Sequence, residues 1–172
     1  MIRIDLSRCT GCRRCETACA FARTGRINRH QARVKVVNIY ETGIDGPVVC
    51  LQCRERYCLG CPDNAITVGP LGQIIVSATA CVLCGGCETR CPIGAIEIHR
   101  NIAYVCDLCG GRPACLEACT EGALVFEPER TGDISLESHN NEARGLNPGL
   151  KRHRFIEREG GRLRKEWEKG RA

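Results

Sequence analysis

The sequence has few of the side chains from which most domains build their core, and it lacks a long apolar segment. Aromatic residues make up 4% of the 172 residues. No stretch approaches the roughly 20 apolar residues of a membrane-spanning helix. The opening residues Met1–Leu6 include an acid and no apolar run typical of a secretory signal. Because large apolar side chains are scarce, we expect inorganic groups to stabilise the fold.

Cysteine, in contrast, is abundant, with 16 residues in the chain. A high cysteine content indicates a disulfide scaffold only in short secreted proteins. The Arg13–Arg14 pair resembles part of a twin-arginine export signal, but it lies between Cys12 and Cys15 and no hydrophobic run follows it. We therefore expect a soluble, cytoplasmic protein, in which thiols stay reduced and clustered cysteines bind metal.

The cysteines form four loops of four. The first and third loops have the spacing C-x2-C-x2-C-x3-C, which holds [4Fe–4S] clusters in bacterial ferredoxins; three cysteines bind one cluster and the fourth binds a neighbouring one. In chain order, the loops contain Cys9, Cys12, Cys15 and Cys19; Cys50, Cys53, Cys58 and Cys61; Cys81, Cys84, Cys87 and Cys91; and Cys106, Cys109, Cys115 and Cys119. They supply the ligands of four [4Fe–4S] clusters with no cysteine left over.

Zinc is the main alternative to iron–sulfur clusters. Its sites usually combine two C-x2-C pairs that are a dozen or more residues apart, whereas successive x2 spacings suit one face of an iron–sulfur cube. Zinc in all four sites is disfavoured, but zinc or a three-iron centre in one divergent site stays open. Disulfides are disfavoured because they need an oxidising compartment.

The formal net charge of +5 counts every cysteine as neutral. A [4Fe–4S] core with four thiolates carries about −2, so four clusters would add about −8 and leave the protein near −3. The basic residues are thus partly counter-charge for clusters. No basic surface interleaved with aromatic residues is apparent, so nucleic acid is not an expected partner.

Short alternating segments predict small β-hairpins beside the loops. A turn, an alanine and a short strand recur at 62–68, 92–98 and 120–126. Further strands are expected at 2–6, 33–41, 73–76 and 102–105, with a turn at 43–47. Glu16, Glu88 and Glu117 occupy matching places in three of the loops, and we expect them to be solvated helix positions. The four histidines lie outside the loops and are expected at the surface.

Residues 128–172 contain no cysteine and predict a basic tail rather than a second domain. Ile156, Leu163 and Trp167 share one face of a possible helix, although Gly160 and Gly161 would weaken it. Two interpretations stay open. The segment is either a mobile, solvated tail or a docking arm whose aromatic residues contact a partner.

The loops and their flanking residues resemble the four-cluster ferredoxin subunits of molybdenum and tungsten oxidoreductases. The resemblance is carried by Pro47–Cys53, Ala80–Cys87 and Cys106–Cys109, and it covers about residues 1–127. This family serves DMSO reductase-type enzymes, formate dehydrogenases, hydrogenases and aldehyde oxidoreductases. The small size and compact fourth loop are most similar to the small subunit of tungsten aldehyde oxidoreductase or of a related benzoyl-CoA reductase.

The resemblance implies an α+β fold of two bacterial-ferredoxin-like modules. Each module would hold two clusters among short antiparallel hairpins and short helices. Residues 1–20 with 100–127 would form one module and residues 48–99 the other. Residues 21–47 would be an insertion. The resemblance says little about residues 128–172, which we expect to be an extended, basic C-terminal tail or docking arm.

The resemblance also pairs loop one with loop four and loop two with loop three. The implied ligand sets are set 1 (Cys9, Cys12, Cys15 and Cys119), set 2 (Cys106, Cys109, Cys115 and Cys19), set 3 (Cys50, Cys53, Cys58 and Cys91) and set 4 (Cys81, Cys84, Cys87 and Cys61). The two-residue spacing between Cys58 and Cys61 departs from the three residues usual in the family. Simple tandem duplication would instead pair loop one with two and three with four.

The motifs favour a non-catalytic electron-transfer subunit. A [4Fe–4S] cluster exchanges one electron and brings no substrate pocket, and no nucleophile, Walker or dinucleotide motif is present. The expected partners are a catalytic molybdo- or tungsto-pterin subunit and a flavoprotein, ferredoxin or other carrier. Alternatives are a hydrogenase or formate dehydrogenase subunit, a structural or assembly protein, and an enzyme with one open iron. Self-association through the tail is also open.

Overall fold

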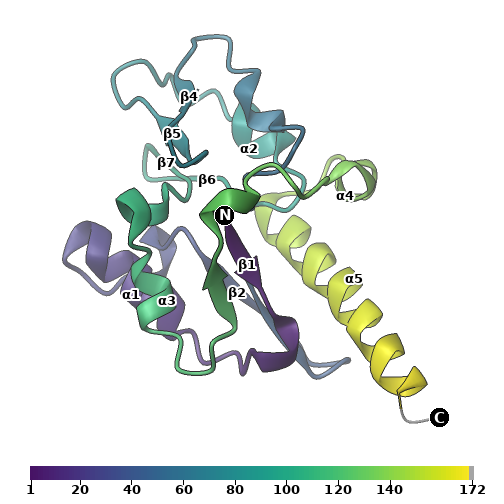
Figure 1. Cartoon of the computed structure of the whole chain (residues 1–172). Coiled ribbons are helices and arrows are strands. Elements are labelled where there is room, and N and C mark those ends of the chain that lie inside the picture. The colour runs from purple at the N-terminus through teal and green to yellow at the C-terminus, as the bar shows by residue number, and fades with distance from the viewer. Residues whose placement is uncertain (171–172) are drawn as a thin grey trace.

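The strands of this protein pair only in twos. The computed structural model describes residues 1–170, so the end of the predicted 128–172 tail lies outside the described residues (Figure 1). Within them, four antiparallel pairs form: β1 (Ile2–Ile4) with β8 (Leu124–Phe126), β2 (Lys35–Ile39) with β3 (Ile44–Val48), β4 (Ile66–Val68) with β5 (Ile74–Val76), and β6 (Glu97–His99) with β7 (Ile102–Tyr104).

Helices α1 to α3 lie between these strands in the chain, and helices α4 and α5 follow the last strand. The α-helices are α1 (Arg14–Thr24), α2 (Gly86–Arg90), α3 (Ala114–Glu117), α4 (Glu137–Glu142) and α5 (Pro148–Lys169). Single 3₁₀ turns occur at Leu6–Arg8, Arg29–Gln31, Tyr57–Leu59, Leu108–Gly111 and Pro128–Arg130. No helix among residues 1–170 is long and apolar enough to cross a bilayer.

The two ends of the cysteine-bearing region lie side by side. Strand β1 pairs with β8 so that Ile2 faces Phe126, and α1 packs against α3. Hairpins β4–β5 and β6–β7 follow each other in the chain between these ends. The α+β class and the short antiparallel hairpins are therefore confirmed. The division into two modules stays a prediction.

The predicted strand at 33–41 is confirmed as β2, but the predicted turn at 43–47 is wrong. The chain reverses earlier, and Gly43 takes the left-handed conformation there with φ at 62°. Residues Ile44–Val48 form strand β3, in which Ile44 and Val48 are buried. Pro47 is tolerated because a two-stranded sheet leaves one side of each strand free of ladder hydrogen bonds.

The expectation of an extended or mobile C-terminal tail is also wrong. Helix α5 is 22 residues long, and the Asn147 side chain caps it by accepting the Leu150 N–H at 2.9 Å. Its apolar face packs on β2 and β3, where Phe155 and Ile156 are buried (Figure 1). The β2–β3 hairpin, which lies almost entirely within the predicted insertion at 21–47, therefore covers this face of the helix. Trp167, near the far end of α5, stays 41% exposed.

Gly160 explains why the two glycines do not prevent this helix. It is buried against β3, and a Cβ placed there would lie 3.0 Å from Ile44 Cγ2. Glycine therefore allows the helix and the strand to approach closely. The neighbouring Gly161 has nothing within 4 Å of the corresponding Cβ position.

Replacing these glycines by leucine separates the two effects. We expect Gly160→Leu to lower the free energy of unfolding by about 1–3 kcal/mol, because the side chain would force α5 away from Ile44. Gly161→Leu should instead raise it by about 0.5–1 kcal/mol, since leucine favours helix more than glycine does. Anaerobic urea unfolding of the iron-loaded proteins measures both values. Equal effects at the two positions would contradict close packing at Gly160.

Candidate iron–sulfur centres

The cysteines of distant loops line common cavities. Cys9, Cys12 and Cys15 of loop one surround one cavity together with Cys119 of loop four. Arg13 begins α1 in the left-handed conformation, with φ at 62°, and this turn allows the loop to fold around the cavity. Cys12 is exposed, whereas Cys15 is buried. All four residues of set 1 are thus brought together.

Loops two and three meet at two further cavities. One is lined by the cysteines of set 3, with Tyr57 and Ile93 beside them. The other is lined by the cysteines of set 4. Cys58 and Cys61 belong to different cavities, so the short spacing between them still directs the two thiols to separate sites.

The residues of set 2 are grouped deeper in the protein. Burial is the main cause of the raised pKa of the Cys115 thiol, and the neighbouring Cys106 and Cys19 raise it further. Burial also raises the pKa of Cys106 to about 12, with Cys19 and Cys109 adding to the shift. The structure therefore lines a common cavity with each of sets 1, 3 and 4, and it buries Cys19, Cys106 and Cys115 of set 2. The assignment of these cysteines as ligands stays a prediction.

Backbone N–H groups point at several of the sulfurs. Ala95 and Ala123 donate to the Sγ atoms of Cys91 and Cys119 at 3.2 and 3.3 Å. These are two of the three alanines of the turn–alanine–strand repeat. The sequence analysis missed these contacts between the repeat and the cysteine sulfurs. If the cysteines bind a cluster, such hydrogen bonds would tune its potential. Arg33 N–H makes the same kind of contact to Cys19 Sγ at 3.2 Å.

The donor chemistry fits an iron–sulfur cluster at each set. All sixteen cysteines are free thiols, and burial raises the pKa of Cys15 and of Cys58 to about 12. Such thiols ionise readily only when a metal replaces the proton. Across residues 1–170, no group of three or more His, Cys, Asp or Glu side chains is placed to hold a single metal ion.

Glu16 is not the solvated residue that the sequence predicted. Its side chain is only 2% exposed, and its Oε1 accepts the Val36 N–H at 2.6 Å. Arg13 and Arg29 donate to the same carboxylate. Because Val36 belongs to β2, this carboxylate ties α1 to the hairpin under α5. The prediction that Glu16 is solvated failed because its partner, Val36, is 20 residues away in the chain.

The matching acids in the other loops differ from Glu16. Glu88 is half-buried and its Oε1 accepts the Ile98 N–H at 2.7 Å, so α2 is linked to β6 in the same manner. Glu117 is exposed, as predicted. Two of the three repeat positions thus use a helix carboxylate to bind a strand N–H.

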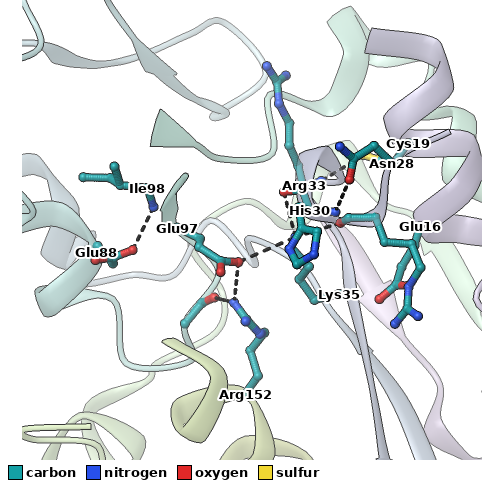
Figure 2. A network of polar contacts seen from close by, with 12 residues as sticks. Glu16, Cys19, Asn28, His30, Arg33, Lys35, Glu88, Glu97, Ile98 and Arg152 are labelled. Atoms are coloured by element: carbon teal, nitrogen blue, oxygen red, sulfur yellow. Dashed lines mark hydrogen bonds and ion pairs between the residues drawn. The ribbon is translucent and has the colours of Figure 1, made fainter. Parts of the chain in front are cut away.

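A polar network connects the first half of the chain to α5. Figure 2 shows Glu97 between Lys35 and Arg152, with N–O distances of 3.6 and 3.2 Å. Nearby, the predicted surface residues His30 and His99 stack with their ring centroids 5.1 Å apart. Arg33 approaches the set 2 thiols, and Asp107 Oδ2 lies 2.7 Å from its Nη1.

Comparison with known proteins identifies the family. Residues 1–26 match the model of a 4Fe-4S binding domain. The polyferredoxin-like subunit of the aliphatic sulfonate oxidoreductase of Pyrococcus furiosus is 36% identical over 124 residues, which cover 70% of this chain and 71% of that protein. The chain belongs to the ferredoxin-like family of [4Fe–4S] proteins.

Two further proteins are similar to this ferredoxin-like protein. An uncharacterised ferredoxin of Methanocaldococcus jannaschii is 35% identical over 142 residues, covering 80% of this chain and 85% of that one. A chain of the solved BamBC active-site complex of benzoyl coenzyme A reductase, crystallised with zinc, aligns with a TM-score of 0.42 at 26% identity. That alignment covers 80% of the ferredoxin-like protein and 87% of the other chain.

The buried carboxylate can be tested against its exposed counterpart. We expect Glu16→Ala to lower the free energy of unfolding by about 1–3 kcal/mol, because it leaves the buried Val36 N–H without its acceptor. Glu117→Ala should change it by less than about 0.5 kcal/mol. Urea unfolding of both variants under anaerobic conditions measures the difference. A Glu16 variant as stable as the Glu117 variant would show that the link to β2 is energetically unimportant.

Proposed function

We propose that this protein is an electron-transfer iron–sulfur subunit with four [4Fe–4S] clusters, one in each cysteine set. When bound, each cluster supplies one-electron transfer. The protein contributes the thiolate ligands, the N–H donors to sulfur and the burial that excludes water. The observation that carries the proposal is the grouping of cysteines from distant loops around common cavities.

We infer the order of the four sets from the effect that their thiols have on one another. Burial is the largest cause of each raised thiol pKa, but cysteines of adjacent sets add to it. Cys15 of set 1 raises the pKa of Cys115 of set 2, and Cys106 of set 2 raises that of Cys50 of set 3. Cys87 of set 4 raises the pKa of Cys58 of set 3. This supports a row in the order 1, 2, 3, 4.

The ends of this row face the surface. Cys12 of set 1 and Cys84 of set 4 are the two exposed cysteines in the described chain. Exposed apolar residues lie beside both, with Phe21 and Ile27 near Cys12 and Val82 near Cys84. An electron would enter at one end and leave at the other, so each end is a candidate docking face for a redox partner.

We further propose that one partner is a catalytic molybdo- or tungsto-pterin subunit, as in an aldehyde oxidoreductase. The other would be a flavoprotein, a ferredoxin or another carrier. The Pyrococcus relative, whose name describes a subunit of an oxidoreductase, supports an assembly with a catalytic chain. Self-association through the C-terminal region stays a prediction. It would use exposed apolar residues of α5 such as Leu150 or Trp167, because Phe155 and Ile156 are already covered.

Serine variants test the ligand pairing. If Cys12 and Cys119 bind the same cluster, Cys12→Ser and Cys119→Ser should alter the same paramagnetic signal, and iron should fall from about sixteen to about twelve atoms per chain if that cluster is lost. Cys53→Ser, in set 3, is the control and should alter a different signal. Tandem pairing of loops three and four would instead make Cys119→Ser match Cys84→Ser. Iron analysis and paramagnetic resonance after dithionite reduction distinguish these results.

Electron transfer itself needs the natural partner. The holoprotein should be reduced by a low-potential donor and then reoxidised when mixed with the large subunit that co-purifies with it. Rapid-mixing absorbance measures the reoxidation, and metal analysis of that subunit identifies tungsten or molybdenum. Iron-loaded protein that no low-potential donor can reduce would refute the proposed function and favour a structural or assembly role.

A further inference from the structure

The first turn of α5 is bound directly to the segment that follows Cys91. Gly94 has φ at 64°, and a Cβ there would lie 2.2 Å from the Pro148 carbonyl oxygen, so the two backbones are in close contact. Arg152 donates to the Gly94 carbonyl at 2.9 Å and pairs with Glu97 (Figure 2). The helix therefore begins on the chain segment next to one cysteine of set 3.

Lys151 lies at the centre of this contact. Its side chain is 2% exposed, and its Nζ donates to the carbonyl oxygens of Glu88 and Thr89 at the end of α2. Cys91 is the C-cap residue of that helix. The long side chain thus carries its ammonium group from α5 to the backbone just before a predicted cluster ligand.

The ammonium group has no carboxylate partner in the part of the chain that the structure describes. Neighbouring cations do have one: Lys35 and Arg152 share Glu97, and Arg33 pairs with Asp107. Burial lowers the pKa of Lys151, while Cys91 and then Glu88 oppose that shift. A buried charge is costly unless an opposite charge lies nearby.

A [4Fe–4S] cluster at set 3 would supply the missing opposite charge. Four thiolates and a 2+ core carry about −2, and Cys91 would be one of the four ligands. The carbonyls of Glu88 and Thr89 hold the ammonium group in place but add no net charge. A cluster at set 3 would therefore account for a buried lysine that forms no ion pair with an acidic side chain of residues 1–170 and on which Glu88 acts less than Cys91 does.

We propose that Lys151 is the buried counter-charge of the set 3 cluster and couples helix α5 to the redox state of that cluster. The inference rests on the proposed function. Reduction adds one electron from the carrier and breaks no bond, so set 3 changes from about −2 to about −3 and attracts the ammonium group more strongly. Lys151 therefore favours reduction, and by linkage reduction favours binding of the first turn of α5.

The charge is tested with Lys151→Met, which keeps a long apolar side chain and removes the ammonium group. Lys165→Met is the matched control, because Lys165 is exposed on the same helix far from set 3. In redox titrations followed by paramagnetic resonance, Lys151→Met should lower the equilibrium constant for reducing one cluster about tenfold, or 59 mV for one electron. That cluster should be the one altered in Cys53→Ser. Lys165→Met should change none of the four.

A second measurement uses the unmodified holoprotein. Amide hydrogen exchange at 148–156 should be slower after dithionite reduction than in the oxidised protein, and Lys151→Met should abolish the difference. Equal exchange in the two redox states of the unmodified protein would overturn the proposal, whether or not any variant folds. Full iron content with four unchanged potentials in Lys151→Met would also overturn it.

These results are separable from the proposed function. If the potential shifts as expected but the large subunit never reoxidises the protein, the coupling stands and the electron-transfer role fails. If electrons flow to the large subunit and the potential does not shift, only the role of Lys151 fails.

Discussion

The structure depends on gathering buried thiols from distant parts of the chain. Burial raises the pKa of the Cys15 and Cys58 thiols to about 12. Such a thiol stays protonated at neutral pH unless a metal binds the thiolate and compensates for its lost hydration. With few aromatic side chains available, the core is built from aliphatic residues such as Ile2, Val34 and Ile93, and several of the cysteines are buried among them. The short hairpins and helices are arranged around them, since strands of three residues are too small to be stable alone.

Helix carboxylates and backbone N–H groups hold this arrangement together. Glu16 and Glu88 each reach from a helix to a strand N–H, and the repeated alanines direct their N–H groups at sulfur. These contacts link the cysteine loops to the strands and bring N–H groups to two of the sulfurs. The same residues are therefore part of both the fold and the candidate electron path.

Local patterns in the sequence predicted much of this structure, and contacts between distant residues account for the failures. The cysteine spacing and the alternating segments are local, so the four loops and the short hairpins could be recognised. The burial of Glu16 depends on Val36, and the position of α5 depends on Gly160 meeting Ile44. Neither contact leaves a periodic pattern in the sequence. Lys151 likewise looks like one more charge of a basic tail until its helix is placed.

The pairing of β1 with β8 has a consequence for synthesis of the protein. Strand β1 leaves the ribosome before the other strands, yet it cannot pair until Phe126 has also emerged. The cavities lined by loops two and three need no residue after Leu136, and the set 4 cavity needs none after Ile98. Under the proposed ligand assignment, set 4 in the middle of the nascent chain is therefore complete before β1 and β8 can meet.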